Sequence, residues 1–295
     1  MKNKILYFGI ALFSFGLFSC ADKPENPYQL GAVFKGDRKV LIEDFTGFKC
    51  TNCPSAALEA ELIDSVYGDN VIVVAIHCTD QFAAPDLGTQ PGDLFYEDFR
   101  TEAGTIYSNE FGVNSLPSGM INRTKFESNV AVSFGSWRSA TSLELEKENT
   151  MAIKFTTVTL DSATRKLNIS VETEVQSSEL SGFEYRFNLY FVESGLVAAQ
   201  KYPPVFIDGS VVEIVDTNHV FDHVLRGTIG DTWGELAYEG TIENGQKKVF
   251  SYEYVVPEKW KIKNSDLVGY VYKNTVDVND REILQVEEFK LEDLE

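Results

Sequence analysis

The sequence is poor in positive charge. Its 295 residues include 26 Lys and Arg against 45 Asp and Glu, which gives a formal net charge of −19 at pH 7. Such a chain repels the phosphates of nucleic acids and anionic lipid headgroups, so we exclude a nucleic-acid partner. Solubility accounts for the acidity, and we assign no cationic partner to it.

Several motifs of common enzymes and binding proteins are also missing. The sequence has no glycine-rich phosphate-binding loop, no G-x-S-x-G, no convincing internal repeat and no low-complexity tract. No cofactor is expected.

Apolar runs long enough to cross a membrane are lacking as well. The run at residues 5–18 is too short to span comfortably, and it follows a basic start and ends in LFSC. This layout is typical of a secretory signal, and its end resembles a bacterial lipobox. The resemblance implies a signal peptide over residues 1–19 and an acyl anchor on Cys20. An ordinary secretory signal that contains Cys20 is the alternative.

Cysteine is scarce, with four in the chain. If Cys20 carries lipid, then Cys50, Cys53 and Cys78 remain, and they lie outside the cytoplasm, where disulfides persist. Three thiols leave one without an obvious partner.

The chain after the anchor divides into segments with different residue patterns. Residues 20–36 hold prolines and polar residues, which is typical of a tether. The next part, to residue 149, alternates strand and helix patterns and predicts a right-handed βαβ unit. The expected strands are 39–46, 70–78 and 119–122, and the expected helices are 54–67, 93–111 and 132–147.

The second half, residues 150–295, consists of β-rich runs separated by turn signals. Many of these runs alternate apolar and polar residues, which predicts an antiparallel Ig-like β-sandwich as a second domain. The seven expected strands are 151–160, 166–175, 184–194, 219–227, 247–256, 266–273 and 283–291.

Cys50 and Cys53 form a C-x-x-C motif between a predicted buried strand and the helix that follows it. In this context the motif indicates a thioredoxin-like redox pair. Backbone N–H groups at a helix N-terminus favour a thiolate, so we expect an exposed Cys50 to attack and Cys53 to resolve. The alternative is an inert disulfide that serves only stability.

The stretch FGVNSLPSGMINR strengthens this resemblance. It places Pro117 just before a short predicted strand, where thioredoxin-like proteins carry a cis-proline that faces the C-x-x-C. The resemblance implies a thioredoxin-like fold with Pro117 in the site, and any enzyme activity would be thiol–disulfide exchange. The chain departs from the family at Phe48-Lys49, where a Trp is common, and at Thr51-Asn52, which replaces Gly-Pro; both changes bear on the redox potential.

Metal binding has weaker support. Cys50, Cys53, His77 and Cys78 are candidate ligands, but adjacent strand residues point to opposite faces, so His77 and Cys78 would hardly serve one ion. We therefore expect no metal site and expect Cys78 to be a small buried hydrophobe.

Two further segments carry weaker expectations. His219 and His223 would share one face of a strand, but they lack a third ligand. The segment 79–92 is expected to form one wall of a groove over Cys50.

Several motifs together resemble the outer membrane protein 28-related lipoproteins of Gram-negative anaerobes. They are the lipobox, VLIEDFTGFKCTNCP, VIVVAIH, LPSGMINR, HVFDHVLRG and GDTWGE. The resemblance implies a thioredoxin-like domain followed by a β-sandwich, held to the outer membrane and facing the periplasm or the medium. It implies no established reaction. The expected partners are the membrane, through Cys20, and a protein or peptide; a non-catalytic surface binding protein or adhesin is the alternative function.

Overall fold

The computed structural model describes residues 37–294, so the predicted signal peptide, Cys20 and the tether lie outside the described residues. The helices are α1 (Cys53–Tyr67), α2 (Asp80–Ala83), α3 (Glu102–Glu110) and α4 (Trp137–Leu145). The strands of the first half are β1 (Val40–Thr46), β2 (Val71–His77), β3 (Ser118–Ile121) and β4 (Ala131–Val132). Those of the second half are β5 (Met151–Asp161), β6 (Lys166–Val175), β7 (Glu184–Glu193), β8 (Leu196–Ile207), β9 (Ser210–Phe221), β10 (Val224–Thr228), β11 (Glu235–Tyr238), β12 (Lys247–Val255), β13 (Ser265–Asn274) and β14 (Ile283–Lys290).

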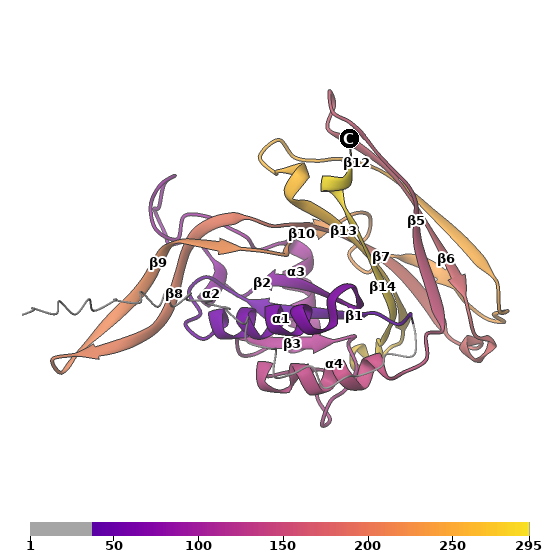
Figure 1. The fold of residues 1–295 in the computed structure, drawn as a ribbon, viewed down its shortest axis with the longest axis horizontal. Coiled ribbons are helices and arrows are strands. Elements are labelled where there is room, and N and C mark those ends of the chain that lie inside the picture. Colours follow the sequence, from indigo (N-terminus) through magenta and orange to yellow (C-terminus); the bar gives the residue numbers. More distant parts are fainter. Residues whose placement is uncertain (1–36, 295) are drawn as a thin grey trace, which may run out of the picture. The chain divides into compact units, whose positions relative to one another are not determined.

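The β1–α1–β2 unit forms as the sequence predicts. β1 pairs with β2 in parallel and with β3 antiparallel. Every residue of β1 is buried, which fits a strand covered on both faces. α1 and α4 pack on one face of β1, and α3 packs on the other (Figure 1). On β3, a Cβ added to Gly119 would lie 2.4 Å from the Trp137 ring, so only glycine admits this close approach of α4.

Strands from both halves of the chain share one sheet. Its order is β14-β13-β7-β10-β2-β1-β3-β4, and Val224 of β10 pairs with Ala75 of β2. The described residues, 37–294, accordingly group as one compact unit. The predicted boundary at residue 149 therefore marks a change from mixed to all-β structure, but the contacts do not divide there.

β5, β6 and β12 form a second layer beside this sheet (Figure 1). Phe187 of β7 and Leu267 of β13 face this layer, whereas Tyr190 and Val268 face α3, β1 and β2. β7 is thus buried on both faces, which explains its near-continuous apolar run. The β-rich, mixed-sheet character of the chain is confirmed.

Some predicted bounds were wrong. The helix expected at 93–111 begins only at Glu102, and the helix expected at 132–147 covers Trp137–Leu145. Six of the seven strands expected in the second half form, but the run 219–227 is split between the end of β9 and β10. The long β8–β9 hairpin, which extends away from the sheets in Figure 1, was not predicted.

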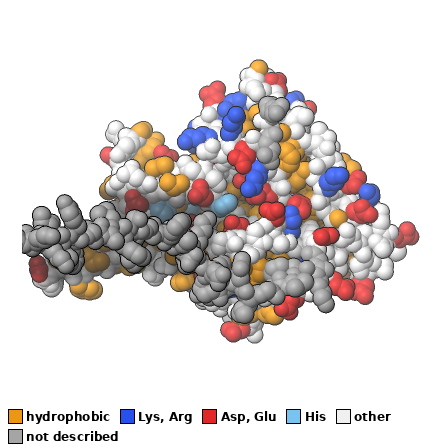
Figure 2. All heavy atoms as spheres, in the orientation of Figure 1, with side chains coloured by type: hydrophobic (Ala, Val, Ile, Leu, Met, Phe, Trp, Pro, Cys, Tyr) orange, Lys and Arg blue, Asp and Glu red, His pale blue; other side chains and the backbone are white. Residues whose placement is uncertain are grey.

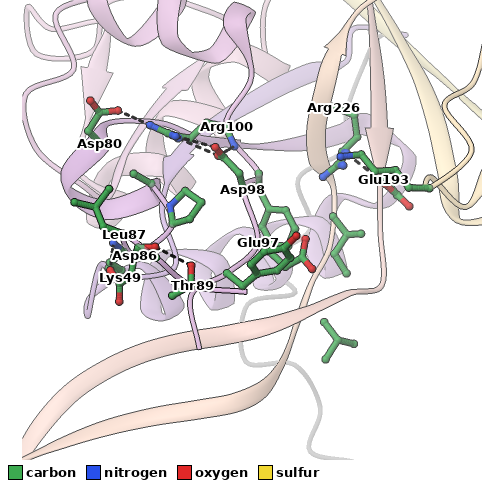
Figure 3. Close-up of a pocket in the computed structure, with 18 residues that line it drawn as sticks. Lys49, Asp80, Asp86, Leu87, Thr89, Glu97, Asp98, Arg100, Glu193 and Arg226 are labelled. Atoms are coloured by element: carbon green, nitrogen blue, oxygen red, sulfur yellow. Dashed lines mark hydrogen bonds and ion pairs between the residues drawn. The ribbon is translucent and has the colours of Figure 1, made fainter. Parts of the chain in front are cut away.

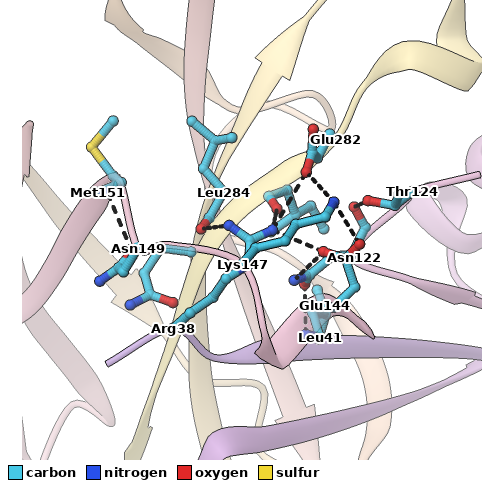
Figure 4. A network of polar contacts seen from close by, with 12 residues as sticks. Arg38, Leu41, Asn122, Thr124, Glu144, Lys147, Asn149, Met151, Glu282 and Leu284 are labelled. Carbon is cyan, nitrogen blue, oxygen red and sulfur yellow. Dashed lines mark hydrogen bonds and ion pairs between the residues drawn. The ribbon is translucent and has the colours of Figure 1, made fainter. Parts of the chain in front are cut away.

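A buried polar network ties the start of the described chain to β14 (Figure 4). Arg38 donates to the Leu284 carbonyl at 2.9 Å and to Glu144 Oε2 at 2.8 Å. Lys147 extends the network to Glu282 at 2.8 Å. The outer strand of the second half is thereby fixed to the first half.

The surface carries mixed charge. Figure 2 shows acidic and basic side chains interspersed on the face it draws. Between residues 37 and 294, no helix combines the length and apolar character needed to cross a membrane.

Candidate functional site

The Cys50–Cys53 pair lies at the junction between β1 and α1. The two sulfurs form a disulfide, with the Cα atoms 5.5 Å apart. Cys53 is the first residue of α1, Pro54 occupies the first turn, and the Asn52 side chain does not cap the helix. Pro54 has no N–H and the Ser55 N–H donates to the Asn52 carbonyl at 3.1 Å, so it is the positive end of the α1 dipole that favours a thiolate after reduction.

A strand from the second half covers the disulfide. Gln200 of β8 donates from Nε2 to the Cys50 carbonyl at 2.9 Å, and the Lys201 N–H donates to the Phe48 carbonyl at 2.8 Å. Cys50 and Cys53 are each only 2% exposed. The expectation that Cys50 would be exposed, and more so than Cys53, was wrong because β8 lies over this loop.

The loop before Cys50 is also held from the α2 side. The Lys49 N–H donates to the Phe82 carbonyl at 2.9 Å, and a Cβ at Gly47 would lie 2.6 Å from that oxygen. Pro117 follows a cis peptide bond and directly precedes β3. Ser118 of β3 pairs with Phe45, which places Pro117 beside the end of β1 that leads to Cys50.

Asp44 of β1 is a buried ionisable residue that sequence reasoning did not single out. It lies on the same face of β1 as Val40 and Ile42, which pack against α1, and it is 2% exposed. Burial raises its pKa to about 7, and its Oδ1 has no hydrogen-bond partner among the described residues. The signal was an acidic pair, Glu43-Asp44, inside an otherwise apolar run.

His77 ends β2 inside a cage of aromatic rings. Its ring lies 5.2 Å from Phe99, 5.3 Å from Phe221 and 6.4 Å from Phe48, measured between centroids. Burial, and then the charge of Arg226, lower its pKa to about 3, so the imidazole is neutral.

Cys78 is fully buried, and burial raises its pKa to about 12, as expected for a thiol that acts as a small hydrophobe. Within residues 37–294, the side chains with metal-ligand spacing are His223, Asp266 and Glu288, which include none of Cys50, Cys53, His77 and Cys78. The expectation that His219 and His223 share a strand face was wrong, because β9 ends at Phe221 and His223 adopts a φ of 56°.

A polar cleft of about 1130 Å³ lies beside the disulfide loop (Figure 3). The segment expected to form a groove wall, 79–92, contributes residues to it, as does Lys49, but neither cysteine lines it. Residues that line the cleft form ion pairs with one another. These pairs are Lys49–Asp86 at 2.6 Å, Arg226–Glu193 at 3.3 Å, and Arg100 with both Asp80 and Asp98.

Comparison with protein families decides the relationship. The family model described as outer membrane protein Omp28 matches residues 105–293. The chain belongs to the Omp28 family. The match confirms the resemblance seen in the sequence and relates the chain to a family of outer membrane proteins. It begins after the disulfide, so membership does not depend on Cys50 or Cys53.

Two of the solved structures similar to this Omp28-family chain come from Porphyromonas gingivalis. HBP35 is 15% identical, with a TM-score of 0.64 over 88% of this chain and 78% of that chain, which shows a shared fold and nothing of activity. A domain of the outer membrane lipoprotein Omp28 is 18% identical over 48% of this chain and 87% of that chain, with a TM-score of 0.28. The comparison with curated proteins found no match.

Proposed function

We propose that the protein is an outer-membrane lipoprotein whose thioredoxin-like region, residues 37–149, exchanges disulfides through Cys50 and Cys53, and that residues 150–295 are the β-sandwich region. The observation that carries this proposal is the disulfide at the N-terminus of α1, the helix that packs on the face of β1 bearing the buried carboxyl of Asp44. A group with a pKa near neutrality is suited to exchanging a proton at physiological pH.

The chemistry of the exchange follows from these positions. The Cys50 thiolate attacks a substrate disulfide, forming a mixed disulfide and releasing one substrate thiolate. The Cys53 thiol gives its proton to Asp44, and its sulfur then attacks the Cys50 sulfur. That step releases the second substrate thiolate and restores the Cys50–Cys53 disulfide, so two electrons pass to the substrate.

Access to the pair depends on β8. Both cysteines are 2% exposed, and Gln200 holds the strand to the Cys50 carbonyl. A substrate therefore has to displace this part of β8 before a sulfur can be attacked. The second half of the chain thus sets the rate at which partners reach the disulfide.

Exchange kinetics test the proposal. In a glutathione buffer near the thioredoxin potential of about −270 mV, we expect the pair to equilibrate and Cys53→Ser to trap a mixed disulfide on Cys50. Gln200→Ala is expected to speed reduction roughly two- to tenfold, since one hydrogen bond contributes about 0.5–1.5 kcal/mol. The matched control is Gln90→Ala, in an exposed loop, which should leave the rate unchanged. A pair that stays oxidised, with a rate indifferent to Gln200, would make the disulfide structural.

The β8–β9 hairpin supports a second candidate, a non-catalytic binding protein or adhesin. Its tip exposes Phe206 by 77%, Val211 by 60% and Ile207 by 53%. Exposed apolar patches of this kind mark interaction sites. Pro203 and Pro204 remove N–H donors from β8, so the contact would be made by apolar side chains with a protein surface rather than by strand addition. Failure of the exchange assays would move the function to this hairpin.

The lipid anchor on Cys20 is part of the proposal, and family membership supports its outer-membrane location. Cys20→Ala is expected to abolish membrane association or signal processing, because the acyl chains are the proposed anchor. Fractionation of cells that express the two forms measures this. A variant that stays with the outer membrane as the wild type does would contradict the anchor.

A further inference from the structure

His223 is held in an unusual conformation just after β9. Its φ of 56° lies in the left-handed region, which is uncommon for a residue other than glycine. The Ser194 hydroxyl accepts from its N–H at 2.9 Å, and its carbonyl accepts from the Ala75 N–H at 2.7 Å. The backbone on both sides of the imidazole is therefore fixed between β7 and β2.

Strand register brings two carboxylates to the same face. Val192 of β7 pairs with Asp266 of β13 and with Leu225 of β10, so these three side chains point one way. His223 lies outside β10, two residues before Leu225, and reaches the cluster from the bend that its left-handed backbone makes. Glu288 of β14 lies two residues before the partner of Asp266, on the same face.

The three side chains converge. One ligand atom of each of His223, Asp266 and Glu288 lies within 4.8 Å of the other two, and all three residues are partly buried. A cavity of about 400 Å³, lined also by Asp64 and Lys290, opens beside His223 and Glu288. The cluster therefore has both a short ligand spacing and a route to solvent.

The electrostatics of the cluster favour a cation. Asp266 and Glu288 are partly buried carboxyls whose ligand atoms lie within 4.8 Å of each other, and Lys39 and Lys290 line the same cavity. Lys39 is itself engaged by Glu287 at 2.7 Å. A divalent ion would relieve the repulsion between the carboxylates more completely than these lysines do.

We propose that His223, Asp266 and Glu288 bind a divalent transition-metal ion. One imidazole and two carboxylates form a three-ligand set that suits Zn²⁺ and leaves a fourth position open toward the cavity. The ion would join β13 and β14 to the segment between β9 and β10. Because His223 lies only two residues after the end of β9, the ion would also fix the base of the β8–β9 hairpin.

Calorimetric titration of the full oxidised chain with Zn²⁺ tests the site. We expect one equivalent to bind with a dissociation constant of roughly 1–10 μM, about −7 to −8 kcal/mol. His223→Asn removes the imidazole and tolerates the left-handed backbone. It should weaken binding at least about tenfold, since changes even outside the ligand shell cost about 10–100-fold.

The chain offers a matched control in His219, which pairs with Tyr202 on the hairpin and lies outside the cluster. His219→Ala should leave the affinity within about twofold. Glu288→Gln provides a near-isosteric second variant that should weaken binding as His223→Asn does.

Co²⁺ gives a readout that is independent of heat. A bound ion should show visible ligand-field absorption in the wild type and in His219→Ala, but not in His223→Asn. Zn²⁺ should also raise the midpoint of thermal unfolding of the wild type and of His219→Ala, but not that of His223→Asn. Equal Zn²⁺ affinity in the wild type and His223→Asn, or no one-equivalent binding below about 100 μM, would overturn the site.

Discussion

Glu43→Gln is expected to lower the free energy of unfolding by about 3–5 kcal/mol, because it leaves the charge of Arg123 buried without its counter-ion. Neither side chain is exposed, and the guanidinium contacts both Glu43 oxygens, at 2.7 and 2.8 Å. The hydroxyls of Tyr190 and Tyr270 complete the cluster, at 3.1 and 2.9 Å from Arg123 Nη2. Burial opposes the charge of Arg123, but Glu43 and these tyrosines keep its pKa well above the ordinary value.

The comparison that isolates this effect is Glu59→Gln. Glu59 also pairs with an arginine, Arg138, at 3.1 Å, but the two side chains are 23% and 28% exposed. Water screens that pair, so we expect a loss below about 1 kcal/mol. Chemical denaturation of both variants measures the difference. Equal losses in the two variants would show that burial does not set the cost. If burial does set it, the double variant Glu43→Gln/Arg123→Met should be more stable than Glu43→Gln, because it no longer buries an unpaired charge.

The Glu43–Arg123 pair also shows where sequence reasoning stopped. Glu43 belongs to β1, and Arg123 follows β3, whereas Tyr190 and Tyr270 come from β7 and β13. The apolar run of β1 predicted the strand, because this signal lies in residues that are adjacent in the sequence. The partners of a charge inside that strand depend on contacts between the two halves, which local periodicity does not encode.

The candidate site, too, could be predicted from the sequence only in part. The C-x-x-C spacing, the strand before it and the helix after it predicted a cysteine pair at the N-terminus of α1. The cover over that pair comes from Gln200, 150 residues away from Cys50 in sequence, in a hairpin that was not predicted. Pairing of β10 with β2 joined the halves that composition had separated at residue 149. Local signals thus fixed the elements, and long-range pairing decided what covers them.

Asp44→Asn is expected to stabilise the protein at pH 8 by roughly 2–4 kcal/mol, with little effect at pH 4. The pKa of Asp44 is raised by burial from 3.8 to about 7, so the folded chain holds this proton more tightly than the unfolded chain does. Well below pH 4 both states are protonated, and the ionisation of Asp44 then has no effect on stability. As the pH rises through 4 to 7, the unfolded state loses the proton first and stability falls, by about 1.4 kcal/mol per unit of difference. Asparagine removes this loss, although its buried amide also needs a partner.

Urea denaturation of the wild type and Asp44→Asn at pH 4, 6 and 8 measures the gap between them, which should widen with pH. Asp86→Asn is the control, because Asp86 is 53% exposed beside Lys49 and should produce no widening gap. If Asp44 also takes the proton of Cys53, the stabilised variant should exchange disulfides more slowly at neutral pH. A gain in stability together with a loss in exchange rate would identify Asp44 as a group kept buried for the reaction. A gap that does not change with pH would show that the Asp44 carboxyl is ionised without cost in the folded chain, and the proton-transfer role would then be wrong.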